Sequence, residues 1–377
     1  MNIYFSIAFT ALIQGGISLF AVYLSTIGYS VKETVLPITL MGLGGLMGSF
    51  LGGMLTDYFS PKKMGIFLSA LWLFMPFSFG SDSYPLICAN MLLVGLSLSS
   101  LRAIYLVIIT KKYTTTEVEE KLSLRRLVLN LGTAAGSGFI GFLLEHKHNF
   151  FGYYFLIIGF LTFVSTTFLP SVQQRAHNKS SQEMAASPST AHYCLTLSAA
   201  LLTLLCFSLI PNIYSLYIKE EIGLTKTAIG NMFAINGLLI TILQIPITKY
   251  LASVNGQLKS LFGIILIGSG VGTIQFVESE WHLYLSTALW TLGEIILFVP
   301  ILKELLRLSP LTNGKTITSY QLTFSFSEIL APLLGGAIIL ISYQLLWNLV
   351  LVLTAISALI MAGLYIKREK ESEYHTY

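Results

Sequence analysis

The chain has 377 residues, of which 54% are hydrophobic and only 11% are charged, and its formal net charge is +4. That charged fraction is less than half of the roughly 25% usual in soluble domains. Together with the long apolar runs, these values indicate a polytopic membrane protein and argue against a nucleic-acid-binding protein. The three cysteines lie within or beside apolar runs, and their spacing fits no metal site.

A membrane-spanning helix needs about 20 apolar residues, and we expect an all-α protein built from such helices. The first run follows Met1 and Asn2 without a basic segment or a small-residue cleavage site, so we expect a retained helix and not a signal peptide. Twelve stretches qualify as spans: 3–25, 34–57, 64–83, 85–108, 122–145, 150–170, 194–218, 228–250, 258–277, 281–302, 315–341 and 344–366.

The first predicted helix contains no acidic residue, and its one strong polar group is Gln14, which stands beside Gly15 and Gly16. An amide can form hydrogen bonds but cannot carry a charge. Gln14 is therefore a candidate substrate-binding residue.

The connection between the second and third predicted helices carries an acid followed by two lysines. Asp57 ends the second helix, Gly53 precedes it in a small-residue stretch, and Lys62 and Lys63 follow Pro61, which we expect to stop the helix. An acid at the end of a buried helix is costly unless it meets a positive partner. We therefore expect these residues to form a gate between helices; the alternative is that Asp57 merely ends a helix in headgroup water.

Three arginines lie near one end of the fourth and fifth predicted helices. Arg102 and Arg125 can be explained as side chains that reach lipid phosphates. Arg126 is followed one turn later by Asn130, and a guanidinium at a helix interface can bind facing carbonyls or the carboxylate of a substrate. Arg126 and Asn130 are therefore candidate substrate-binding residues.

The longest polar stretch divides the chain into two halves. We expect a six-helix bundle over 1–170, a cytoplasmic linker over 171–193, a second six-helix bundle over 194–366 and a tail over 367–377. Such a polar stretch is typical of a flexible linker.

The two halves repeat at an offset of 195 residues. Ile27–Ser30 matches Ile222–Thr225, and the small residues Gly136, Ser137 and Gly141 correspond to Ala331, Pro332 and Gly336. Parallel halves of this kind imply a pseudo-two-fold axis along the membrane normal, a substrate site between the halves and rocking-type alternating access.

Polar residues in the seventh and eighth predicted helices are further candidates for substrate binding. Asn212 follows Pro211 at an expected helix break, where freed carbonyls can line a cavity. Asn236 and Gln244 lie in the eighth helix. Each of them can equally be a hydrogen bond between helices, worth about 0.6 kcal/mol.

Two acids, Glu294 and Glu328, lie inside the spans of the second half. Intramembrane acids are functional candidates, and burial favours the neutral form of a carboxyl group. Either residue could change its protonation as the site is hydrated and dehydrated, so both are proton-coupling candidates. The alternative is an acid bonded to a neighbouring helix without a role in transport.

The basic residues define the two sides of the protein. Seventeen of the 22 Lys and Arg residues lie in one set of loops and tails, here called the basic side, and the opposite set holds Lys32, Lys147, Lys219 and Lys226. Because Lys and Arg concentrate in cytoplasmic loops, we expect both termini and the Asp57 loop to be cytoplasmic.

These residues resemble the major facilitator superfamily over nearly the whole chain. Gly53, Asp57, Lys62 and Lys63 match that family's signature Gly-x-x-x-Asp-(Arg/Lys)-x-Gly-x-(Arg/Lys)-(Arg/Lys), from which Tyr58 and Ser60 depart. The resemblance implies twelve transmembrane helices in two pseudo-symmetric six-helix bundles. It also implies that Asp57 faces the start of the eleventh helix when the cytoplasmic side is closed.

The fifth and tenth helices resemble those of the drug- and metabolite-exporter-like branch of the family. The residues that carry this resemblance are Arg126, Asn130, Gly132, Gly136, Gly141, Gly293, Glu294 and Pro300. We therefore expect a secondary transporter with alternating access that performs proton-coupled export of a small organic molecule, such as a drug-like compound or a siderophore. The alternative is proton-coupled or facilitated uptake of a small nutrient such as an organic acid or amino acid.

We expect this transporter to be a monomer in the cytoplasmic membrane of a bacterium, with protons as coupling ion and without nucleic acid, metal or cofactor. An intramembrane enzyme would need His, Asp or Ser at catalytic spacing on facing helices, and no His lies deep in a predicted span. A non-transporting receptor is the other alternative outside this class.

Overall fold

The structure is a computed structural model that describes residues 3–56, 58–74, 79, 83–113, 115–170, 189–311 and 313–374. Every regular element in these parts is a helix, which confirms the all-α prediction. The chain forms two compact units. Unit 1 comprises Met1–His177 and Pro211–Thr241, and unit 2 comprises Asn178–Ile210 and Ile242–Tyr377. The boundaries predicted around the linker stay a prediction.

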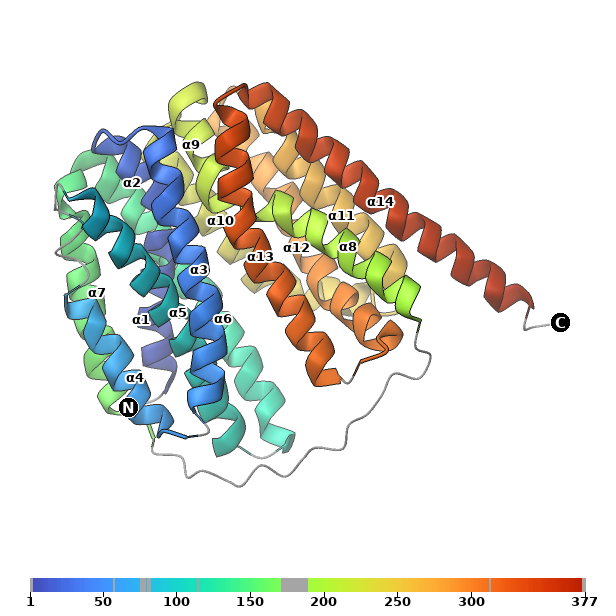
Figure 1. Ribbon diagram of the computed structural model, residues 1–377, viewed down its shortest axis with the longest axis horizontal. Coiled ribbons are helices and arrows are strands. Elements are labelled where there is room, and N and C mark those ends of the chain that lie inside the picture. Colours follow the sequence, from blue (N-terminus) through green and yellow to red (C-terminus); the bar gives the residue numbers. More distant parts are fainter. Residues whose placement is uncertain are drawn as a thin grey trace. The chain divides into compact units, whose positions relative to one another are not determined.

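The first part of the chain forms helices at each of the six predicted spans (Figure 1). The first span is divided into α1 and α2, which are bent by 45° against each other. The elements are α1 (Ile3–Ile17), α2 (Phe20–Thr26), α3 (Val31–Leu55), α4 (Pro61–Ala70), η1 (Leu71–Leu73), α5 (Tyr84–Lys112), α6 (Thr115–His146), η3 (His148–Phe150) and α7 (Phe151–Thr167).

The remaining chain also forms helices at its six predicted spans. The seventh span is interrupted by two π-helical turns, η4 and η5. The elements are α8 (Thr190–Ser208), η4 (Ile210–Tyr214), α9 (Ser215–Tyr217), η5 (Ile218–Ile222), α10 (Lys226–Tyr250), α11 (Gly256–Gly272), η6 (Thr273–Phe276), α12 (Glu280–Leu308), α13 (Asn313–Ile339) and α14 (Tyr343–Tyr374).

The described part contains nine helices long and apolar enough to cross a membrane, or ten if the bent pair α1–α2 is one span. The helices at the two other predicted spans, α4 and α7, are shorter. One local expectation was wrong: Pro61 does not stop a helix but begins α4, and α3 already ends at Leu55. Proline suits the first position of a helix because its fixed φ is helical and its missing N–H would be unpaired there anyway.

The repeat predicted from the sequence is present in the backbone of two turns. Gly28 has a φ of 101° and Gly223, 195 positions later, a φ of 75°; this left-handed region favours glycine because a Cβ is strained there. In both copies a hydroxyl residue then caps the next helix: Ser30 and Glu33 form reciprocal bonds, and the N–H of Ala228 donates to Oγ1 of Thr225 at 3.0 Å.

A second irregularity recurs at the same offset. The π-helical residues 210–214 correspond to residues 15–19, where α1 ends and the chain bends into α2. In place of the helix break that the sequence predicts near Asn212, the structure has a π-helical stretch within the span Thr190–Ile222. Such turns shift the helical hydrogen bonds and leave carbonyl groups without their usual partners.

Helices within each unit pack closely through small residues and hydroxyl pairs. In unit 1, α3 packs along α5 and α1 along α6; in unit 2, α11 packs along α12 and α14. Hydroxyl pairs connect Thr10 with Tyr105 at 3.0 Å in unit 1 and Thr203 with Ser357 at 2.9 Å in unit 2. In a bilayer such packing and polar contacts, worth about 0.6 kcal/mol each, hold helices together because lipid is as apolar as leucine.

We predict that Gly95→Ala destabilises the protein by about 1–3 kcal/mol, the usual cost of overpacking. A Cβ at Gly95 would overlap the carbonyl oxygen of Met41 on α3, whereas a Cβ at Gly363 on α14 has no atom within 4 Å. The matched control Gly363→Ala should be neutral or slightly stabilising, since alanine favours the helix. Thermal unfolding of the purified variants measures both, and equal melting temperatures would contradict the packing argument.

Candidate functional site

The three arginines singled out in the sequence lie at similar depth on two neighbouring helices of unit 1. Arg102 lies eight residues inside the apolar span Tyr84–Thr110, and Arg125 lies five residues inside the span Glu120–His146. At 1.5 Å per residue these positions are about 12 Å and about 8 Å from the span ends. The arginines therefore stand deeper than residues of a connecting loop.

At the centre of this cluster, one donor lacks an acceptor among the described residues. The positive charges of Arg102 and Arg126 act on the guanidinium of Arg125. Nε of Arg125 is buried and has no hydrogen-bond acceptor among the described residues. An unpaired buried donor costs about 1–3 kcal/mol, and more when it is charged. An anionic group placed here would bind with favourable charge and hydrogen bonding.

Two of the predicted binding residues, Arg126 and Asn130, lie on α6, and two others lie on helices that cross it. Arg126, Asn130 and Thr133 follow at helical spacing and share one face. A Cβ on Gly15, next to Gln14, would overlap the carbonyl oxygen of Thr133, and a Cβ on Gly237, next to Asn236, would lie 2.7 Å from the carbonyl oxygen of Asn130. The crossings of α1 and α10 with α6 thus bring Gln14 and Asn236 to the level of Asn130.

Two other predicted residues stand in different surroundings. Asn212 is buried at 7% exposure in η4, beside the buried Ile213 and Tyr214. Gln244 lies on α10, in the part of that helix that belongs to unit 2.

The two proton-coupling candidates lie at the same level of neighbouring helices in unit 2. Glu294 is fourteen residues before the end of α12, and Glu328 is fifteen residues after the start of α13. One turn nearer to the connection, the rings of Phe298 and Phe324 meet with centroids 6.3 Å apart. Both acids are half-buried, which is the environment in which a carboxyl group can alternate between its neutral and charged forms.

The structure describes only some of the residues of the predicted gate. Asp57 lies outside the described residues, and Gly53 belongs to the last turns of α3. Lys62 and Lys63 follow Pro61 in the first turn of α4, where Lys62 is half-buried and Lys63 exposed. The role of these residues as a gate stays a prediction.

The sequence did not predict the polar contacts, here called ties, that the structure shows on the side opposite to the basic side. Oγ of Ser25 donates to Glu220, whose carboxylate also pairs with Lys219 at 2.7 Å. In a second tie, the backbone N–H of Lys226 donates to Oε2 of Glu145 at 2.7 Å. Ser25 and Glu220 are 195 positions apart, so the repeat offset itself could have signalled this pair.

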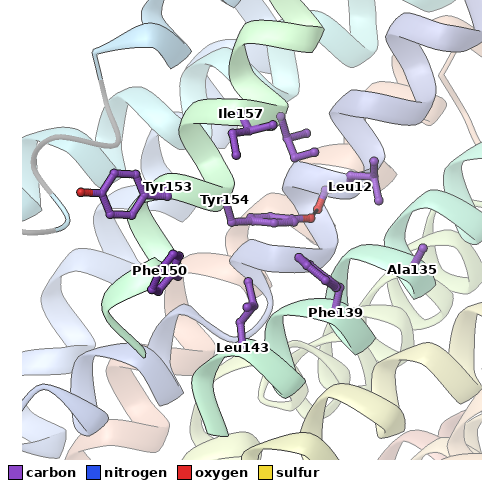
Figure 2. Close-up of a pocket in the computed structure, with 9 residues that line it drawn as sticks. Leu12, Ala135, Phe139, Leu143, Phe150, Tyr153, Tyr154 and Ile157 are labelled. Atoms are coloured by element: carbon purple, nitrogen blue, oxygen red, sulfur yellow. Dashed lines mark hydrogen bonds between the residues drawn. The ribbon is translucent and has the colours of Figure 1, made fainter. Parts of the chain in front are cut away.

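An open pocket of about 560 Å³ lies between α1, α6 and α7 in unit 1. Figure 2 shows the ring of Tyr154 across its middle, with the hydroxyl donating to the carbonyl oxygen of Leu12 at 2.7 Å. The other lining side chains are almost entirely apolar, and Phe139 and Tyr153 are exposed at 53% and 61%. This pocket suits hydrocarbon and offers no charge to an ionic solute.

Comparison with known families gives a match over both halves of the chain. A family model described as Major Facilitator Superfamily matches residues 3–196 and again residues 195–376. No curated protein matches the sequence.

Solved structures with a similar fold include several peptide transporters of low sequence identity. The peptide transporter POT in complex with sulfate is 14% identical, with a TM-score of 0.73 over 96% of this chain and 94% of that chain. A POT family transporter in complex with a thioalcohol conjugated peptide is 12% identical, with a TM-score of 0.75 over 98% and 95%. A POT family transporter in complex with 5-aminolevulinic acid is 13% identical, with a TM-score of 0.73 over 98% and 95%.

We predict that a cross-link between residues 25 and 220 blocks the transport cycle, because the two residues belong to different predicted six-helix halves, which alternating access would move apart on this side. The test uses Ser25→Cys with Glu220→Cys in a protein whose three native cysteines, Cys88, Cys194 and Cys206, are serine. Oxidation should stop solute flux in proteoliposomes and reduction should restore it. The two single-cysteine proteins serve as controls, and unchanged flux in a fully cross-linked protein would contradict the prediction.

Proposed function

The chain belongs to the Major Facilitator Superfamily, and from this premise we propose that it takes up a small organic solute with a carboxylate or similar anionic group by alternating access. The observation that carries the proposal is the arginine cluster around Arg125, whose buried Nε has no acceptor among the described residues. Arginine binds carboxylates through two parallel hydrogen bonds, so one anionic group could satisfy this donor and reduce the repulsion among the three charges.

The neighbouring polar residues suit the rest of such a solute. Asn130 and Asn236 offer amide donors and acceptors, and Gln14 offers another at the crossing of α1 with α6. Amide groups can bind an amino, hydroxyl or peptide group without adding charge to the site. An organic acid, an amino acid or a short peptide fits this combination.

The similar structures favour uptake over the export predicted from the sequence. The export prediction depended on the resemblance of the fifth and tenth predicted helices to exporter-like members. The structures that are similar over nearly the whole chain are described as peptide transporters, and the compounds bound in two of them, sulfate and 5-aminolevulinic acid, carry anionic groups. The anionic groups of these two compounds support the proposed substrate class. The sequence identities of 14% and 13% are too low to assign either compound to this chain.

We propose protons as the coupling ion, carried by Glu294 or Glu328 in unit 2. A half-buried carboxyl group binds a proton more readily when its surroundings lose water. An inward proton gradient would then drive accumulation of the solute.

We predict that Arg125→Gln weakens solute binding by about 1.5–3 kcal/mol, roughly tenfold to a hundredfold, which is the worth of hydrogen bonds to a charged group. Counterflow of radiolabelled 5-aminolevulinic acid and of an amino-acid mixture in proteoliposomes gives the KM values. Lys112→Gln, which removes an exposed charge at the end of the neighbouring helix α5, is the matched control. The proposal is wrong if both variants bind and transport these solutes as wild type does.

We predict that Glu328→Gln abolishes accumulation driven by a pH gradient while counterflow persists, because exchange of solute needs no net proton movement. Glu294→Gln tests the other candidate in the same assay. Glu278→Gln, an exposed acid outside the helices, should leave gradient-driven accumulation intact. Gradient-driven uptake at the wild-type level in both intramembrane variants would exclude a coupling role for these two acids.

A further inference from the structure

A second, more polar pocket lies in unit 2, at the basic side. It has a volume of about 200 Å³ and lies where α10 ends and α11 begins, beside the last turns of α12. The charged residues that line it are Lys259, Lys303, Glu304 and Arg307. We refer to it as the unit 2 basic pocket.

The carboxylate that lines this pocket, that of Glu304, is already paired with arginine side chains. Glu304 is only 4% exposed. Nε of Arg307 donates to its Oε2 at 3.1 Å, a second nitrogen of Arg307 donates to Oε1, and Nη1 of Arg368 lies 3.6 Å from Oε1. Because this pairing accounts for the negative charge, Lys259 and Lys303 give the pocket an excess of positive charge.

The lysines keep donors free for an incoming anion. Nζ of Lys259 donates to the carbonyl oxygen of Leu251 at 3.1 Å, which uses one of the three donors of an ammonium group. Lys303 is exposed, and no ion pair of this residue is found among the described residues. Gly256, the first residue of α11, also lines the pocket, so the positive end of that helix adds to the same field.

The remaining walls are apolar and lie at the end of the membrane spans. Ile247, Leu251, Ile295, Ile296 and Val299 line the same pocket. A phosphate bound by the lysines would thus have hydrocarbon-compatible surface beside it, at the depth where lipid headgroups lie. Basic pockets between helices on the cytoplasmic side are typical binding places for anionic lipid headgroups.

We propose that the unit 2 basic pocket binds the phosphate of an anionic phospholipid, with Lys259 and Lys303 as the main contacts and the apolar wall against the acyl chains. A free phosphate would use the same two lysines but would gain nothing from the apolar wall. The charge of the pocket and the chemistry of its walls together favour the lipid.

The test compares lipid binding to the full-length protein in detergent by native mass spectrometry, with phosphatidylglycerol and phosphatidylcholine of identical acyl chains. We expect wild type to retain phosphatidylglycerol preferentially. Lys259→Gln with Lys303→Gln should weaken that binding about 25-fold, or about fivefold per lysine, and leave phosphatidylcholine binding unchanged. The matched control is Lys249→Gln with Lys367→Gln, which removes two exposed charges from the same side.

A single variant and a competition with inorganic phosphate complete the test. The single variant Lys303→Gln, at an exposed position, keeps the test valid if the double variant is unstable. Millimolar inorganic phosphate should not displace the lipid; displacement at equal affinity would assign the pocket to a free anion and overturn the proposal. An equal loss of phosphatidylglycerol in the control variant would also overturn it, because the effect would then be general surface charge.

Discussion

Close backbone contact along α6 is the constraint on which the arrangement of unit 1 depends. Small residues let α1 and α10 approach until backbone meets backbone: a Cβ on Gly132 would lie 2.6 Å from Cβ of Ala11, and one on Gly141 would lie 2.7 Å from Cα of Gly230. Packing of this kind replaces the hydrophobic effect as the force between helices in lipid. It fixes which face of α6 is available to polar residues, and therefore where Arg126 and Asn130 stand.

The charged residues of the spans follow from the same constraint. A charge within the bilayer is expensive unless it finds a partner, water or a ligand. Glu304 is buried and has two arginines around it, whereas the charged neighbours of Arg125 among the described residues are Arg102 and Arg126. The first arrangement is satisfied within the protein, and the second is the observation from which we propose an anionic substrate.

Most of the helices could be predicted from the sequence, because a span needs length and hydrophobicity and both can be read directly. The start of α4 at Pro61 and the bend after α1 could not, since Pro61 is compatible with either end of a helix and the apolar run over residues 3–25 continues through the bend at Ser18. Among the site residues, types such as Arg126 and Glu328 stand out in apolar runs. The residue types of Ser25 and Glu220, an ordinary hydroxyl and a surface acid, do not stand out, and only their separation by the repeat offset of 195 residues points to their contact.

The irregular turns at residues 15–19 and 210–214 have a consequence for which substitutions this part of the protein can accept. At the first of them the N–H of Leu19 donates to the carbonyl oxygen of Gly16, three residues back, at 3.2 Å, so the regular α-helical ladder is interrupted there. The polar groups presented at a break belong to the main chain, so replacing side chains leaves them where they are. Exchange of the side chains around both irregular turns would therefore leave the same two backbone features in place.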